Sequence, residues 1–132
     1  MSAPNIVNVA TITAKTATAL LTGTSAVNAV NNPASSGKVM KINSLIISNV
    51  DGTNAADLTL AVVKVNFTPD GVTNFDTSGT FHIAKTVSVP ADATLVLLDT
   101  PIYLMEADVL KGGASAASDL DLFVSYEVID DA

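Results

Sequence analysis

Few residues in this chain are of types that perform chemistry at a site. His82 is the only histidine and cysteine is absent, so the nitrogen and sulfur ligands that usually hold zinc cannot cluster. Serine and aspartate are frequent, but no Gly-x-Ser-x-Gly turn presents a nucleophilic serine. The segment Lys111-Gly112-Gly113 lacks the length and the Lys-Ser ending of a phosphate-binding loop. We therefore expect no enzymatic activity, no catalytic residue and no cofactor, and we interpret His82 as a surface or interface residue.

One group of oxygen-bearing side chains could bind a cation. Asp51, Asn54 and Asp57 surround a turn and could offer oxygens to calcium. Their spacing lacks the alternating ligands and the terminal glutamate of a calcium-binding loop. The sequence therefore predicts no metal site.

The charge pattern disfavours nucleic acid as a partner. Six Lys and Arg residues against thirteen Asp and Glu residues give a net charge of −7, and the lysines are scattered singly along the chain. Only 14% of residues are charged, where about 25% is usual in soluble domains. Small polar residues on the surface would explain part of this deficit. Charge depletion is also typical of interface cores, so we expect a permanent assembly.

Alternation with a period of two residues recurs along the chain and predicts strands. We expect them at 6–21 (as one strand or two), 26–30, 38–50, 57–66, 81–89, 94–98, 101–105 and 120–129. The strand at 57–66 should pair with that at 38–50. Only 105–111 could form a helix, of about two turns at most. About eight short strands predict an all-β fold, a single-domain antiparallel β-sandwich over residues 1–132. A jelly roll is one topology that fits, and residues 1–5 would form a flexible N-terminal arm.

Four large apolar residues break the alternation of the strands at 38–50 and 120–129. They would lie on polar or half-polar faces, whereas Met40, Ile42 and Ile46 would face the core. Full burial of such a side chain is worth roughly 1.5–3 kcal/mol, so exposing several of them in a monomer would be costly. We expect a homo-oligomer whose interface contains the residues that break the pattern: Leu45, Ile47, Phe123 and Ile129.

Four stretches of the chain carry a resemblance to known proteins: SGKVMKINSLIISNVDGTNAADLTL (36–60), GTFHIAKTVSVPADATLVLLD (79–99), PIYLMEADVL (101–110) and SAASDLDLFVSYEVID (115–130). In this order they resemble a group of small virion proteins of marine and cyanobacterial phages. Similar runs recur in that group in the same order, and together they cover somewhat more than half of this chain. Met105 and Ala107 depart from the acidic residue and the glycine that are usual at those positions.

The resemblance implies an accessory component of a bacteriophage virion. We expect a capsid decoration (cement) protein that stabilises the phage head, made in the host cytoplasm and located on the outer capsid surface. The alternatives are a neck, tail or fibre component, or a receptor- or glycan-binding module at a fibre tip. The partners would be the major capsid protein or other virion proteins, with no direct nucleic acid and no membrane. Residues 1–5 and 31–37 would reach a neighbour, and the three-fold sites of icosahedral lattices favour a trimer.

Overall fold

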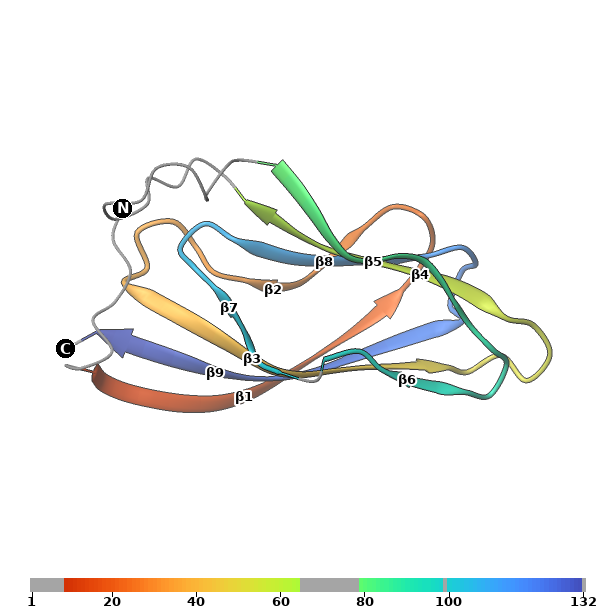
Figure 1. Cartoon of the computed structure of the whole chain (residues 1–132), viewed down its shortest axis with the longest axis horizontal. Helices are drawn as coiled ribbons and strands as arrows, with labels where there is room; N and C mark the ends of the chain where they lie inside the picture. The colour runs from red at the N-terminus through yellow and green to blue at the C-terminus, as the bar shows by residue number, and fades with distance from the viewer. Residues whose placement is uncertain (1–8, 65–78, 99, 132) are drawn as a thin grey trace.

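The computed structural model describes residues 9–64, 79–98 and 100–131, which form two antiparallel β-sheets packed face to face (Figure 1). Sheet A contains five strands: β1 (Val9–Leu21), β9 (Leu120–Asp131), β3 (Lys38–Asn49), β6 (Thr94–Val96) and β7 (Ile102–Leu104). Sheet B contains four strands: β2 (Val27–Asn31), β8 (Val109–Ala114), β4 (Ala56–Lys64) and β5 (Gly79–Val89). No helix occurs in these residues, and the predicted all-β sandwich is confirmed. The expected arm at 1–5 lies outside the described residues.

The strand pairs are nested along the chain, so that each pair encloses the one before it; we call this arrangement the nested ribbon. The innermost pair is β4 with β5, followed by β3 with β6 and β7, then β2 with β8, and finally β1 with β9. Successive pairs of this series lie alternately in sheet B and sheet A, so most connections cross from one sheet to the other. The prediction that β4 pairs with β3 was therefore wrong, because β4 pairs with β5 and β8 in the opposite sheet.

The core lies between the two sheets and consists of aliphatic side chains. β9 supplies alternate residues to it as its pattern predicts, with Leu120, Leu122 and Val124 at most 1% exposed. Leu58 and Leu60 of β4 face them from sheet B and are fully buried. Each such side chain contributes roughly 1.5–3 kcal/mol on burial, so this core holds the two sheets together.

β3 contains a β-bulge at Asn43. Ile42 lies opposite Tyr126 of β9, whereas Ser44 lies opposite the adjacent Ser125, so one residue of β3 has no counterpart. An extra residue shifts the alternation by one position, and side chains beyond the bulge exchange faces. The core face expected for the second half of β3 is therefore reversed.

The segment 105–111, the only one that could have formed a helix, is not helical: residues 106 and 107 form a turn, and β8 begins at Val109. No strand was expected at residues 109–114, which contain Gly112 and Gly113. Gly112 lies in β8 at a point where the core leaves little room for a side chain. A Cβ atom there would lie 3.1 Å from Leu60 Cδ1 and 3.2 Å from Leu21 Cδ2. Glycine thus allows close approach of the sheets at this point.

The loop at 31–37 is anchored by a buried asparagine. Asn32 donates from Nδ2 to the carbonyl oxygens of Lys38 at 2.9 Å and Leu104 at 3.1 Å. Its Oδ1 accepts a hydrogen bond from Ser36 Oγ at 2.6 Å. The base of the loop is fixed to the sandwich at Asn32, whereas Asn31 and residues 33–35 are exposed.

Candidate interaction surface

The outward-pointing side chains of sheet A can be followed from strand to strand. Phe123 of β9 lies opposite Thr18 of β1 on one side and Ile46 of β3 on the other. Ile46 in turn lies opposite Val96 of β6. Opposite residues of antiparallel strands share a face, with Cβ atoms about 4.5–5.5 Å apart. Phe123, Ile46 and Val96 therefore form a continuous apolar row, which we call the outer row.

The outer row is accessible to solvent. Phe123 is 43% exposed and Val96 is 65% exposed, with Ile46 half-buried between them. Leu20 of β1 points to the same side of the sheet, one outward position beyond Thr18, and is 66% exposed. Large apolar side chains grouped on one exposed face are typical of a contact with another protein.

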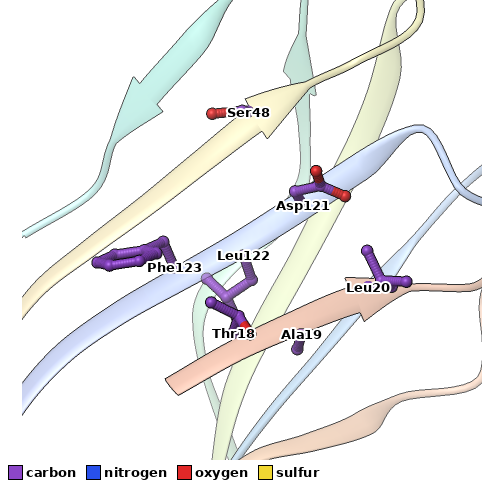
Figure 2. A pocket seen from close by; sticks show the side chains of 7 residues that line it. All are labelled: Thr18, Ala19, Leu20, Ser48, Asp121, Leu122 and Phe123. Carbon is purple, nitrogen blue, oxygen red and sulfur yellow. The ribbon is translucent and has the colours of Figure 1, made fainter. Parts of the chain in front are cut away.

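A pocket of 330 Å³ adjoins the outer row where β1 ends (Figure 2). Asp121, Ser48 and Thr18 bring a carboxylate and two hydroxyl groups to it, and Phe123 and Leu20 bring apolar surface. The complete lining is Thr18, Ala19, Leu20, Ser48, Asp121, Leu122 and Phe123. This set can accept hydrogen bonds from a cationic or hydroxyl-bearing group. It contains no histidine, cysteine or lysine that could act as a base or nucleophile beside the serine.

A pocket of 150 Å³ on sheet B is lined mostly by residues with polar side chains. The complete lining is Thr24, Asp57, Thr59, Thr86, Gly113, Ala114 and Ser115. The hydroxyl groups here serve the fold: Ser115 Oγ accepts a hydrogen bond from the Asp57 backbone N–H at 2.8 Å, and Thr59 Oγ1 accepts one from Thr86 N–H at 3.2 Å. His82 is exposed on the edge strand β5. The outer row thus lies on sheet A, whereas Phe81 and Val87 are the exposed large apolar residues on β5 of sheet B.

The four predicted interface residues do not lie together. Leu45 and Ile47 are fully buried in the core, so the prediction that they contact another subunit was wrong. The bulge at Asn43 explains the error, because it turns these two side chains inward. Ile129 is only 8% exposed and presents little surface. Phe123 alone of the four lies on the exposed outer row.

Three residues of this surface were missed by the sequence interpretation. Ile46 was assigned to the core because the bulge was not foreseen. Val96 lies in a continuous apolar run that has no alternation to assign a face. Leu20 is in a strand rich in threonine and alanine, where the apolar pattern is weak. The cross-strand register was the information needed to bring them together.

The carboxylate of Asp51 is used within its own turn. Its Oδ1 accepts a hydrogen bond from the Thr53 backbone N–H at 2.8 Å, and its Oδ2 accepts one from Asn54 Nδ2 at 3.2 Å. The hydrogen bond from Thr53, followed by that from Asn54, lowers the pKa of Asp51 below its ordinary value. Within residues 9–64, 79–98 and 100–131, no three His, Asp or Glu side chains group in a way that could hold a metal ion.

Asp108 is a buried carboxylate that the sequence interpretation also missed. It is 1% exposed, and its Oδ2 accepts hydrogen bonds from Lys64 Nζ at 3.2 Å and from the Met105 backbone N–H at 2.9 Å. Its Oδ1 is buried without a hydrogen-bond partner. The ion pair joins β4 to the turn before β8, a structural role in keeping with a buried, paired charge.

The comparisons with known proteins identify no relative, so the outer row and its pocket are the main guide to function. Among the described residues, no helix is long and apolar enough to cross a membrane. The chain matches no protein-family model, no curated protein and no solved structure.

Proposed function

We propose that this protein is a non-enzymatic structural protein of a bacteriophage particle and that it decorates and stabilises the capsid. The observation that carries the proposal is the outer row, in which Phe123, Ile46 and Val96 present an uncharged apolar strip on one face of a sheet. Such a face suits contact with another protein better than contact with a small substrate. The resemblance of the sequence to small phage virion proteins supplies the class of particle.

The strand order supports a more specific description of the fold. β6 and β7 both pair with β3 and can be counted as one interrupted strand. The nested ribbon then has eight strands divided between two sheets, and we propose that this topology is a jelly roll. Jelly rolls are typical of viral capsid and lectin domains. A fold alone does not define a function, so this topology adds to the argument from the outer row and does not replace it.

The proposed mechanism is mechanical. Each copy would bind the major capsid protein through modest apolar contacts, and repetition by the symmetry of the shell would multiply their effect. Apolar contacts depend weakly on ionic strength, unlike pairs of surface charges. With a net charge of −7, the protein would act from outside the shell, away from the packaged nucleic acid.

The pocket beside the outer row favours one alternative, a receptor- or glycan-binding module at a fibre tip. The ring of Phe123 could stack on a sugar while Asp121 and Ser48 accept hydrogen bonds from its hydroxyl groups. Such a module would be present in few copies per particle, as would a neck or tail component. Copy number therefore separates these alternatives from a decoration protein.

The proposal can be tested by rebinding purified protein to particles that lack it. We expect Phe123→Asp to weaken binding about tenfold or more, because an apolar contact is replaced by a charge. Phe81→Asp is the matched control, since Phe81 is 46% exposed but lies on β5 of sheet B. This variant should bind like the wild type. Equal binding by all three proteins would show that the outer row does not contact the particle.

A further inference from the structure

Among the residues that the structure describes, none pairs with the outer edge of β1. β1 is the terminal strand of sheet A, and within the described part of the chain only β9 pairs with it. Positions 10–16 are all exposed, and the strand contains no proline and only one charged residue, Lys15. A long edge strand presents a row of unpaired backbone N–H and C=O groups, which is a template for another strand.

The other sheet edges that the structure describes are poorer templates. β6 and β7 have three residues each. β2 has five residues and a register shift between Asn28 and Val30. β5 is longer, but its pairing with β4 shifts twice, and Thr86 within it has a positive φ of 49°. Short strands and bulges protect these edges from pairing with another chain, whereas β1 has neither protection between 11 and 21.

The sequence of β1 is complementary to itself in one antiparallel register. Thr16 is the middle residue of the regular segment 11–21, so a two-fold axis at Thr16 pairs the whole segment with its copy. Ile12 then lies opposite Leu20 of the second copy, and the same contact occurs again by symmetry. These two side chains are 61% and 66% exposed in the single chain. Facing each other, they would shield each other from water.

Charge supports the same register. With the axis at Thr16, Lys15 faces Ala17 of the second copy. With the axis one residue earlier, Lys15 would face its own copy, and like charges directly opposite are destabilising. An axis at Ala17 would leave Ile12 without an apolar partner in the regular segment. The register centred on Thr16 keeps the two Lys15 side chains from facing each other and places Ile12 opposite Leu20.

We propose that the protein forms a two-fold dimer with a second copy of itself through antiparallel pairing of β1 with β1, centred on Thr16. The two A sheets become one continuous sheet. This dimer takes the place of the trimer that the three-fold sites of icosahedral lattices favoured. Its contact does not use Leu45 and Ile47, which lie in the core.

The pairing does not depend on the proposed function. If the protein does bind a capsid, the dimer places both outer rows on the same side of the continuous sheet, so both can meet one partner surface. If the protein serves another purpose, the dimer forms all the same. Failure of particle binding and failure of dimerisation are therefore separate results.

Sedimentation and light scattering at about 100 µM provide the first measurement. The wild type should have twice the monomer mass of 13.5 kDa. Thr16→Lys places two positive charges opposite each other across the axis, and Thr16→Glu places two negative charges there. Each variant alone should dissociate at least tenfold more readily than the wild type, and an equimolar mixture of the two should recover the dimer.

Thr13→Lys is the matched control, because Thr13 would face Ala19 of the second copy and not another lysine. This variant should dimerise at least as well as the mixture, and circular dichroism melting should show that all variants fold. The proposal is overturned by a wild-type monomer or trimer at this concentration, by Thr16→Lys behaving like the wild type, or by Thr13→Lys dissociating as readily as Thr16→Lys. It is also overturned if the mixture fails to recover the dimer.

Discussion

Asn49, the last residue of β3, donates a hydrogen bond from Nδ2 to the carbonyl oxygen of Val89 at 2.9 Å and so links sheet A to the end of β5 in sheet B. The same nitrogen donates to the Asn54 carbonyl at 3.0 Å, and the side-chain oxygen accepts from Asp51 N–H at 2.9 Å. Asn49→Ala would leave these groups without partners. We expect it to lower the free energy of unfolding by about 2 kcal/mol or more, measured by denaturant titration.

Asn28→Ala is the control for this substitution. Asn28 is exposed on β2, so its replacement should change the free energy of unfolding by less than about 0.5 kcal/mol. Equal losses for the two variants would contradict the bridging role of Asn49.

Gly112→Ala should destabilise the sandwich, because the new methyl group would press on Leu60 and Leu21 between the sheets. Overpacking of this kind costs about 1–3 kcal/mol. Gly52→Ala is the comparison, since the nearest atom to a Cβ there is Asp92 Oδ2 at an ordinary 3.6 Å. Thermal melting should show a clear drop for Gly112→Ala and no drop for Gly52→Ala; the reverse order would mean that the sheets are not this close.

Leu122 and Phe123 are neighbours in sequence with opposite roles. Leu122→Ala empties part of the core and should cost about 2–5 kcal/mol. Phe123→Ala removes an exposed ring and should cost less than about 1 kcal/mol. Chemical denaturation of both variants checks this. A large loss for Phe123→Ala would show that this ring serves folding and not an interaction.

The stability contributed by Asp51 should depend on pH. Its pKa in the folded protein is lowered from 3.8, chiefly by the hydrogen bond from Thr53 N–H, so the carboxylate stabilises the fold above pH 3.8. This contribution is lost as pH falls through the lowered pKa. Asp51→Asn should therefore melt below the wild type at about pH 6 and approach it below about pH 3. A difference in melting temperature that stays constant over this range would contradict the assignment.

Strand positions could be predicted from the sequence, but their partners could not. The alternation from Leu120 to Val128 predicted β9 and its core face, and Asp51-Gly52 marked the end of β3. The nested ribbon pairs β1 with β9, strands that lie at opposite ends of the chain, and no local pattern encodes such long-range pairing. β8 was missed because its glycines serve a close approach of the sheets, which only the packed structure shows.

The outer row could be predicted only at Phe123. That residue interrupts a clear alternation, so its outward position was evident from the sequence alone. A single bulge at Asn43 then exchanged the faces of Ile46 and Leu45, moving one into the outer row and the other into the core. Bulges carry no reliable local signature, so the rest of the row required the strand register.

The central claim is that the protein covers a phage capsid, and the copy number in purified particles tests it most directly. Quantitative mass spectrometry, combined with an electron microscopy reconstruction, would measure both the number of copies and their location. We predict many copies, in a fixed ratio to the major capsid protein, distributed over the whole outer surface of the head. A few copies confined to the neck, tail or fibres, or no copies in the particle, would contradict the claim.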